Sequence, residues 1–179
     1  GALELLKEGN ARFRGNVKAQ RDLMRQVSET SDGQWPIAVV LSCIDSRTSA
    51  ELIFDQGIGD IFSARVAGNF VNDDILGSME FACKVAGAKL VVVLGHSHCG
   101  AVKGACDNVE LGLLTRMLEK IQPAVDAVAV PAAAADRTSA NPDFVADVAR
   151  ENVLRGVADV TSRSEVLREM AESGSIQIV

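Results

Sequence analysis

Two continuous apolar runs constrain the fold of this chain more than any other feature of its sequence. The first spans residues 37–42 (IAVVLS) and the second spans residues 90–94 (LVVVL). A strand with one face in water alternates apolar and polar residues, but these runs are apolar on both faces. That pattern, at strand length, is typical of strands buried inside a parallel sheet.

Helical patterns alternate with these runs along the chain. Leu3, Leu6, Asn10 and Phe13 share one side of a helical wheel and predict an amphipathic helix at the start. Further helices are expected over residues 19–28, 49–55, 72–86, 143–159 and 164–173, with helical segments between residues 100 and 130. Two more strands are expected over residues 61–66 and 176–179.

This alternation predicts an α/β fold with a central, mainly parallel β-sheet flanked by helices. The length of 179 residues suits one domain with helical extensions. We expect a single domain over residues 1–179, in which residues 1–30 form an N-terminal helical arm and residues 36–179 form the α/β core.

The composition narrows the class of protein. The chain is 47% hydrophobic and carries a net charge of −6 without a basic run, which gives no support for nucleic-acid binding. No apolar stretch approaches the ~20 residues of a membrane span. The first residues lack the basic and apolar regions of a secretion signal. We expect a cytoplasmic protein, with the periplasm or an organelle as the alternative if a targeting segment was removed.

Reactive side chains follow each buried run, at residues 42–47 (SCIDSR) and 95–100 (GHSHCG). Functional residues of parallel sheets gather at the carboxyl ends of the strands. Zinc prefers Cys and His ligands, and the spacing of His96 and Cys99 suits two ligands of one metal. From these residues alone, a zinc site shared with Cys43 and a set of ordinary buried side chains are about equally supported.

Two other kinds of site contain similar residues, a phosphate-binding P-loop and a cysteine hydrolase. A P-loop requires Lys and then Ser or Thr after its last glycine, but Ala101 and Val102 follow Gly100. A Cys-His-Asp hydrolase is a further alternative, although it leaves the second cysteine without a role. Cys83 and Cys106 lie in expected helices without a neighbouring His, so we expect them to be buried residues and not ligands.

The two motifs resemble those of the β-class carbonic anhydrases, in particular the plant-like branch. Residues 43–47 (CIDSR) are similar to the family's C-x-D-S-R motif, and residues 95–101 (GHSHCGA) are similar to its G-H-x-x-C-G-A motif. The similarity continues through residues 5–13, 54–62, 65–69 and 76–82, so it covers nearly the whole chain.

This resemblance implies a zinc enzyme that hydrates carbon dioxide reversibly to bicarbonate and a proton. Cys43, His96 and Cys99 would hold Zn²⁺, with water or Asp45 in the fourth position. In the active form Arg47 pairs with Asp45 and holds it off the metal. The expected chemistry is attack of zinc-bound hydroxide, because zinc lowers the pKa of water from 15.7 to about 7.

The resemblance also implies a set of substrate-contacting residues, for which packing in the core is an equally good account of the apolar members. The set is Gln34, which donates a hydrogen bond to substrate in the plant-like branch, with Phe62, Val66, Ala67, Phe81 and Gly100. Trp35 is expected to pack against the core. Val40 stands where regulated family members carry Trp, so no regulation by bicarbonate at that position is expected.

Two rival functions share this pattern. A hydrolase of carbonyl sulfide or carbon disulfide on the same scaffold would use the same metal chemistry. A non-catalytic zinc-binding module would need four permanent protein ligands, with Asp45 unable to leave. The family also implies a homodimer or homotetramer, with a small-molecule substrate and neither nucleic acid nor membrane as partner.

Overall fold

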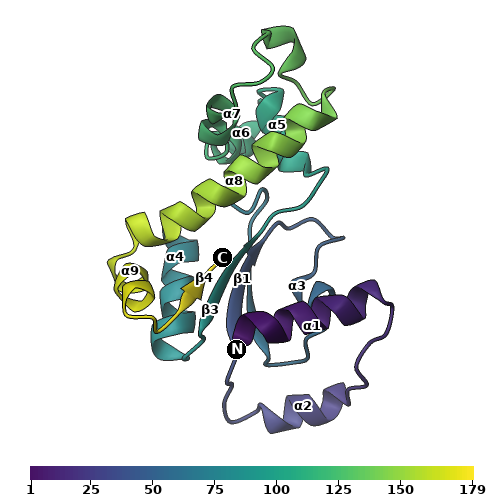
Figure 1. Cartoon of the computed structure of the whole chain (residues 1–179), viewed down its shortest axis with the longest axis vertical. Coiled ribbons are helices and arrows are strands. Elements are labelled where there is room, and N and C mark those ends of the chain that lie inside the picture. Colours follow the sequence, from purple (N-terminus) through teal and green to yellow (C-terminus); the bar gives the residue numbers. More distant parts are fainter.

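The computed structural model describes residues 1–179 and places the two apolar runs at the centre of a parallel sheet (Figure 1). The strand order is β2-β1-β3-β4, and every neighbouring pair is parallel. The strands are β1 (Ala38–Ser42), β2 (Ile61–Arg65), β3 (Leu90–Leu94) and β4 (Gln177–Ile178). The prediction of a mainly parallel sheet with β1 and β3 inside it is therefore confirmed.

Helices cover both faces of this sheet, and several of them gather beyond the carboxyl ends of its strands. They are α1 (Ala2–Arg14), α2 (Leu23–Glu29), α3 (Ala50–Ile53), α4 (Asp73–Glu80), α5 (Gly100–Cys106), α6 (Gly112–Leu118), α7 (Gln122–Ala127), α8 (Pro142–Arg163) and α9 (Glu165–Glu172). A π-helical turn, η1 (Phe81–Val85), continues α4, and a short 3₁₀ turn, η2 (Ala134–Asp136), precedes α8. No helix combines the length and the apolar character needed to cross a membrane.

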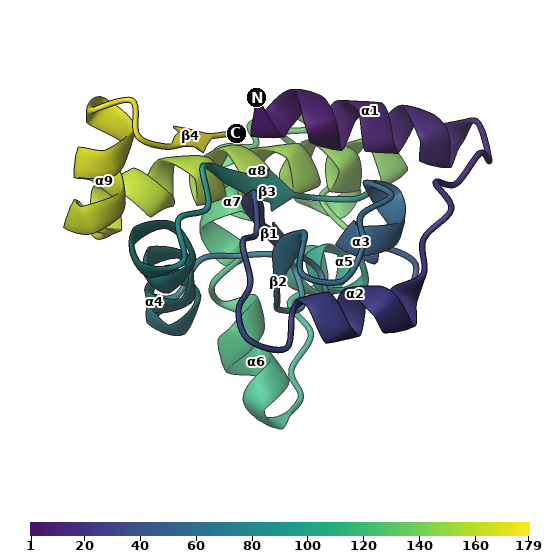
Figure 2. The same cartoon turned by 90° about the horizontal axis from the view of Figure 1, so that it is seen from below.

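Alternate residues of the central strands face opposite layers of helices, because successive strand side chains point to opposite faces. Val39 and Leu41 belong to an apolar cluster with Met79 of α4 and Leu167 of α9. Val40 packs in a second cluster with Leu6 of α1. Figure 2 shows α4 and α9 on one side of the sheet and α1 and α3 on the other.

A third apolar cluster lies beyond the carboxyl ends of the strands. Val102 of α5, Leu118 of α6, Val125 of α7 and Val148 of α8 meet there, where Figure 1 shows these helices gathered above the sheet. The cluster also contains Cys43 and Cys99. Two of the predicted metal ligands are thus embedded in an apolar surrounding.

Several expected boundaries differ from the structure. The second helix begins at Leu23 and not at residue 19, because Asp22 caps it and the preceding segment binds the core. The helix expected to end at residue 159 runs on to Arg163, and Ser164 then caps α9 by accepting a hydrogen bond from the Leu167 N–H. Trp35 was expected to pack, but 75% of its surface is exposed.

Asp55 ties the N-terminal segment to the α/β core. This residue is 6% exposed and has φ of +44°, a left-handed conformation that Asp tolerates better than most residues. Its carboxylate accepts hydrogen bonds from Arg12 Nε at 2.5 Å, Arg21 Nη1 at 2.7 Å and the Ala19 N–H at 3.1 Å. The Arg12 and Arg21 guanidinium groups hold the pKa of the Asp55 carboxyl well below its usual range.

We predict that Asp55→Asn lowers the melting temperature at neutral pH, because the two guanidinium groups lose their charged partner. Since folding lowers the pKa of Asp55, its stabilisation is present above the ordinary carboxyl pKa of about 3.9 and is lost as pH falls below it. Thermal denaturation of parent and variant should therefore show a difference in melting temperature that shrinks below about pH 4. Exposed Asp32 makes no hydrogen bond through its side chain, so Asp32→Asn is the control. A difference that is unchanged by acid would contradict the prediction.

Candidate metal centre

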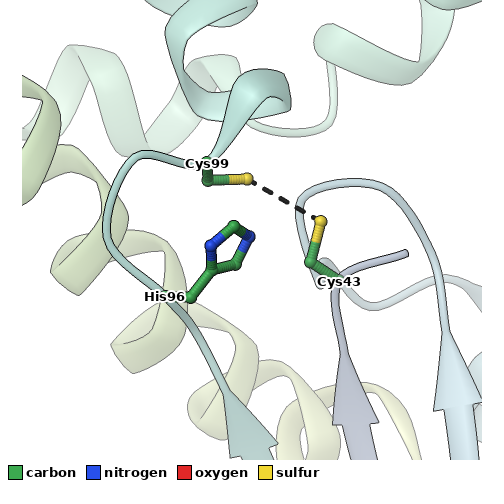
Figure 3. Close-up of side chains that lie close together, drawn as sticks. All are labelled: Cys43, His96 and Cys99. Carbon is green, nitrogen blue, oxygen red and sulfur yellow. Dashed lines mark hydrogen bonds between the residues drawn. The ribbon is translucent and has the colours of Figure 1, made fainter. Parts of the chain in front are cut away.

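The two motifs meet at the carboxyl edge of the sheet because the strands that precede them are neighbours. The register pairs Ser42 of β1 with Leu94 of β3, so the loops that follow leave the sheet side by side. Cys43 comes from the first loop, and His96 and Cys99 come from the second (Figure 3). One ligand atom from each of these three residues lies within 4.8 Å of the others.

The spacing of the two thiols fits a tetrahedral zinc ion. Cys43 Sγ and Cys99 Sγ are 3.8 Å apart. Two sulfurs at about 2.3 Å from one zinc ion, separated by a tetrahedral angle, would be about 3.8 Å apart. A disulfide would need about 2.05 Å, and both cysteines are free. The distance between the thiols therefore suits two ligands of one metal.

The imidazole of His96 supplies the third ligand atom. Its Nδ1 lies 2.9 Å from the carbonyl oxygen of Ser97, which favours the tautomer with the proton on Nδ1. Its Nε2 is buried and has no hydrogen-bond partner, and Figure 3 shows the ring beside the two thiols. A buried nitrogen without a partner is costly in a protein interior. A metal ion would satisfy this atom, so the residues present fit zinc.

The thiols differ in their surroundings. Burial raises the pKa of the Cys99 thiol, and the neighbouring Cys43 adds to the rise, while the N–H groups of Ala101 and Val102 oppose it. The Gly68 N–H donates to Cys43 Sγ at 3.3 Å. Since metals bind the thiolate, a bound cation would offset the cost that burial places on deprotonation.

Cys83 and Cys106 lie apart from this cluster, as expected. Cys83 is buried in η1 and Cys106 is buried at the end of α5. Burial raises the pKa of each thiol to about 11. Both thiols stay protonated at neutral pH, which suits packing residues.

Asp45 and Arg47 form a bidentate ion pair beside the candidate ligands. Arg47 Nε lies 2.9 Å from Asp45 Oδ1 and Arg47 Nη2 lies 2.7 Å from Asp45 Oδ2. The Arg47 backbone N–H also donates to Oδ1, at 2.9 Å. The Arg47 side chain and then its backbone N–H hold the pKa of Asp45 well below its usual range. Asp45 Oδ2 stands 4.0 Å from His96 Nε2, so the carboxylate is near the cluster but engaged by the guanidinium.

Arg65 is a residue of this site to which the motifs assigned no role. From the end of β2, its Nε donates to the Cys43 carbonyl at 2.9 Å and its Nη2 donates to the Asp45 carbonyl at 2.7 Å. Thr48 adds a hydrogen bond from its Oγ1 to the Asp45 carbonyl at 3.0 Å. One feature of the sequence could have indicated this role: Arg65 is a charged residue at the end of β2, the strand beside β1.

The expected substrate-contacting residues fall into two groups. Ala67 adjoins Gly68, and Gly100 follows Cys99 with open space where a Cβ would stand. Gln34 is exposed in the loop before β1, at the opposite end of that strand from Cys43. Within one chain the structure therefore brings Ala67 and Gly100 to the ligand loops but not Gln34.

Two phenyl rings of the expected set lie elsewhere. Phe62 and Phe81 meet edge to face with 6.1 Å between their centroids. They line a cavity of about 690 Å³ beside the edge strand β2, together with Arg65 and Ile75 and without any of the three ligand residues. Val66 instead packs against the sheet core and the third apolar cluster.

Comparison with known proteins shows which family has a similar sequence. The model of the carbonic anhydrase family matches residues 38–179. Carbonic anhydrase 2 of Mycobacterium tuberculosis is 36% identical over 179 residues, which cover 99% of this chain and 84% of the relative. A carbonic anhydrase of Mycolicibacterium smegmatis is 42% identical over 131 residues, which cover 69% of this chain and 63% of the relative.

Solved structures share the fold. The β-carbonic anhydrase CcaA aligns with a TM-score of 0.72 and 26% identity, covering 98% of this chain and 80% of CcaA. One of two tetrameric β-carbonic anhydrases from Sordaria macrospora aligns with a TM-score of 0.70 and 22% identity, covering 87% of this chain and 82% of that one. With a family match over most of its length and a Cys-His-Cys cluster at the expected strand ends, this chain belongs to the β-class carbonic anhydrases.

Proposed function

We propose that this chain catalyses the reversible hydration of carbon dioxide to bicarbonate and a proton, with zinc held by Cys43, His96 and Cys99. The observation that carries the proposal is the cluster of three ligand atoms, within 4.8 Å of one another, beside a carboxylate held by Arg47. Three protein ligands leave a fourth position for chemistry. Zinc, when bound, supplies a Lewis acid that lowers the pKa of water from 15.7 to about 7.

Asp45 and Arg47 have different roles in the proposed reaction. Asp45 Oδ2 accepts a hydrogen bond from the attacking water and orients its lone pair toward carbon dioxide. Arg47 holds both carboxylate oxygens in a planar fork, which keeps Asp45 ionised and out of the fourth ligand position. Lys would be a poorer restraint, because its ammonium is a point charge without that fork.

The apolar part of the substrate site is proposed to come from a second copy of the chain. Phe62 and Phe81 line an open cavity on the edge strand, and 51% of Phe81 is exposed. Gln34 is exposed as well, away from the ligands of its own chain. A second copy packed along β2 would bring these groups to the neighbouring metal centre, where carbon dioxide needs an uncharged wall.

The N-terminal arm, residues 1–30, supports the same homo-oligomer. Leu23, Met24 and Val27 of α2 are 54%, 75% and 46% exposed, and burying such side chains against a partner is favourable. We propose a homodimer as the smallest active unit, and tetramers are described for the similar Sordaria proteins. Four free cysteines suit the reducing cytoplasm, which is the compartment that we propose.

We predict that the purified protein contains one zinc ion per chain and hydrates carbon dioxide faster than it hydrolyses carbonyl sulfide. Elemental analysis and parallel assays with the two substrates check this. Cys43→Ser should lose both zinc and activity, because it removes a ligand. The control variant, Cys83→Ala with Cys106→Ala, should keep both. Faster turnover of carbonyl sulfide, or an absence of zinc after reconstitution, would refute the proposed function.

We predict that Arg47→Ala lowers kcat/KM for carbon dioxide hydration by about 10-fold to 100-fold while zinc content stays unchanged. Without the guanidinium group of Arg47, Asp45 is free to occupy the fourth ligand position. Arg47→Lys should recover only part of the loss. Stopped-flow assays measure both, with exposed Arg116 in α6 changed to Ala as the control. Parental activity of Arg47→Ala at neutral pH would rule out this restraint.

We predict that two variants, each with lowered activity, form a more active mixture when they are refolded together. Arg47→Ala damages the metal centre, and Phe81→Ala damages the wall that the partner provides. In a mixed dimer one site then carries both defects and the other carries none. If Phe81 instead serves the metal centre of its own chain, every site in the mixture has a defect and no activity returns. Mixing either variant with itself is the control.

A further inference from the structure

Asn152 is a buried asparagine in the interior of α8. It is 5% exposed, and its Nδ2 donates to the carbonyl oxygen of Gly68 at 2.7 Å. The two residues are 84 positions apart in the sequence. Asn is a poor residue for a helix interior, and burying its amide is costly unless the amide is hydrogen-bonded. The hydrogen bond to Gly68 offsets the cost of a buried asparagine inside a helix.

Gly68 is held between the two loops that supply the metal ligands. Its φ of +82° is a conformation that residues with side chains rarely adopt. A Cβ at this position would lie 2.4 Å from Cδ1 of Ile121, the residue that precedes α7, and 3.3 Å from Cβ of Ala101. The positive φ and the close approach both favour glycine, which is also the residue whose backbone is least restrained by itself.

The two backbone polar groups of Gly68 point to different partners. Its N–H donates to Cys43 Sγ at 3.3 Å, and its carbonyl accepts from Asn152. Hydrogen bonds to a ligand atom orient that ligand and tune its interaction with the metal. The Asn152 amide is therefore connected to the thiol of Cys43 through a single residue.

We propose that Asn152 is a positioning residue of the metal centre, which holds Gly68 so that its N–H aims the Cys43 thiolate at the metal. Asn152 does not itself reach the reacting atoms. The inference rests on the proposed function for the identity of the metal. A purely structural Asn152 would only anchor α8, and removing it would change stability without changing the metal centre.

The decisive experiment compares metal binding by the parent, Asn152→Leu and Asn141→Ala. Leu has the same number of side-chain heavy atoms as Asn and the same branch at Cγ, and it removes the donor. Asn141 caps the same helix by accepting from the Phe144 N–H, so Asn141→Ala weakens α8 without touching Gly68. Zinc affinity is measured by competition with a chelator, and the Co²⁺-substituted proteins are compared through their thiolate-to-cobalt absorption band.

We expect Asn152→Leu to lower zinc affinity by about 10-fold to 100-fold and to shift the cobalt band. Asn141→Ala should lower the melting temperature but leave affinity and band unchanged. Equal affinity and an unchanged band in Asn152→Leu would overturn this inference alone. A parent that binds neither metal would overturn the proposed function as well.

A measurement on the parent decides the matter if Asn152→Leu does not fold. Hydrogen exchange of the Gly68 amide, followed by NMR in the metal-free and zinc-loaded protein, reports on its bond to Cys43. We expect protection in both forms and slower exchange with zinc. An amide that exchanges at the rate of an exposed one would overturn the inference.

Discussion

The parallel pairing of β1 with β3 is the constraint on which the rest of the structure depends. Both strands are covered on both faces, so neither can shift register without moving its apolar side chains out of their clusters. Because Ser42 is opposite Leu94, Cys43 and Cys99 meet although 56 residues separate them. A metal centre follows from sheet pairing, and not from any local segment.

Around this meeting point the chain surrounds two thiols with donors and apolar groups. The third apolar cluster encloses Cys43 and Cys99, which strengthens electrostatic interactions by excluding water. Gly68 donates to one thiol, while Arg65 fixes the carbonyls of Cys43 and Asp45. These contacts orient the two loops that carry the candidate ligands.

The metal centre and the two phenyl rings proposed to contact the substrate lie in different parts of one chain. Within one chain, the ligands lie at the carboxyl edge of the sheet, while the Phe62 and Phe81 rings line a separate cavity on the edge strand. In the proposed oligomer, a neighbouring copy would bring its Phe62 and Phe81 rings to this metal centre. The same proposed association would cover the exposed apolar side chains of α2, which is favourable because it removes them from water.

The sequence by itself predicted β1 and β3, because runs apolar on both faces are typical of buried parallel strands. It also placed Cys43, His96 and Cys99 just beyond the ends of those strands, but the family resemblance, and not the spacing, implied that they are the ligands. The same resemblance implied the pairing of Asp45 with Arg47, which the structure contains. Only the tertiary structure decided the roles of Asn152, Arg65 and Asp55 and the exposure of Trp35. Their partners lie up to 84 positions away, and such contacts depend on packing between elements, which leaves no periodic or local pattern in the chain.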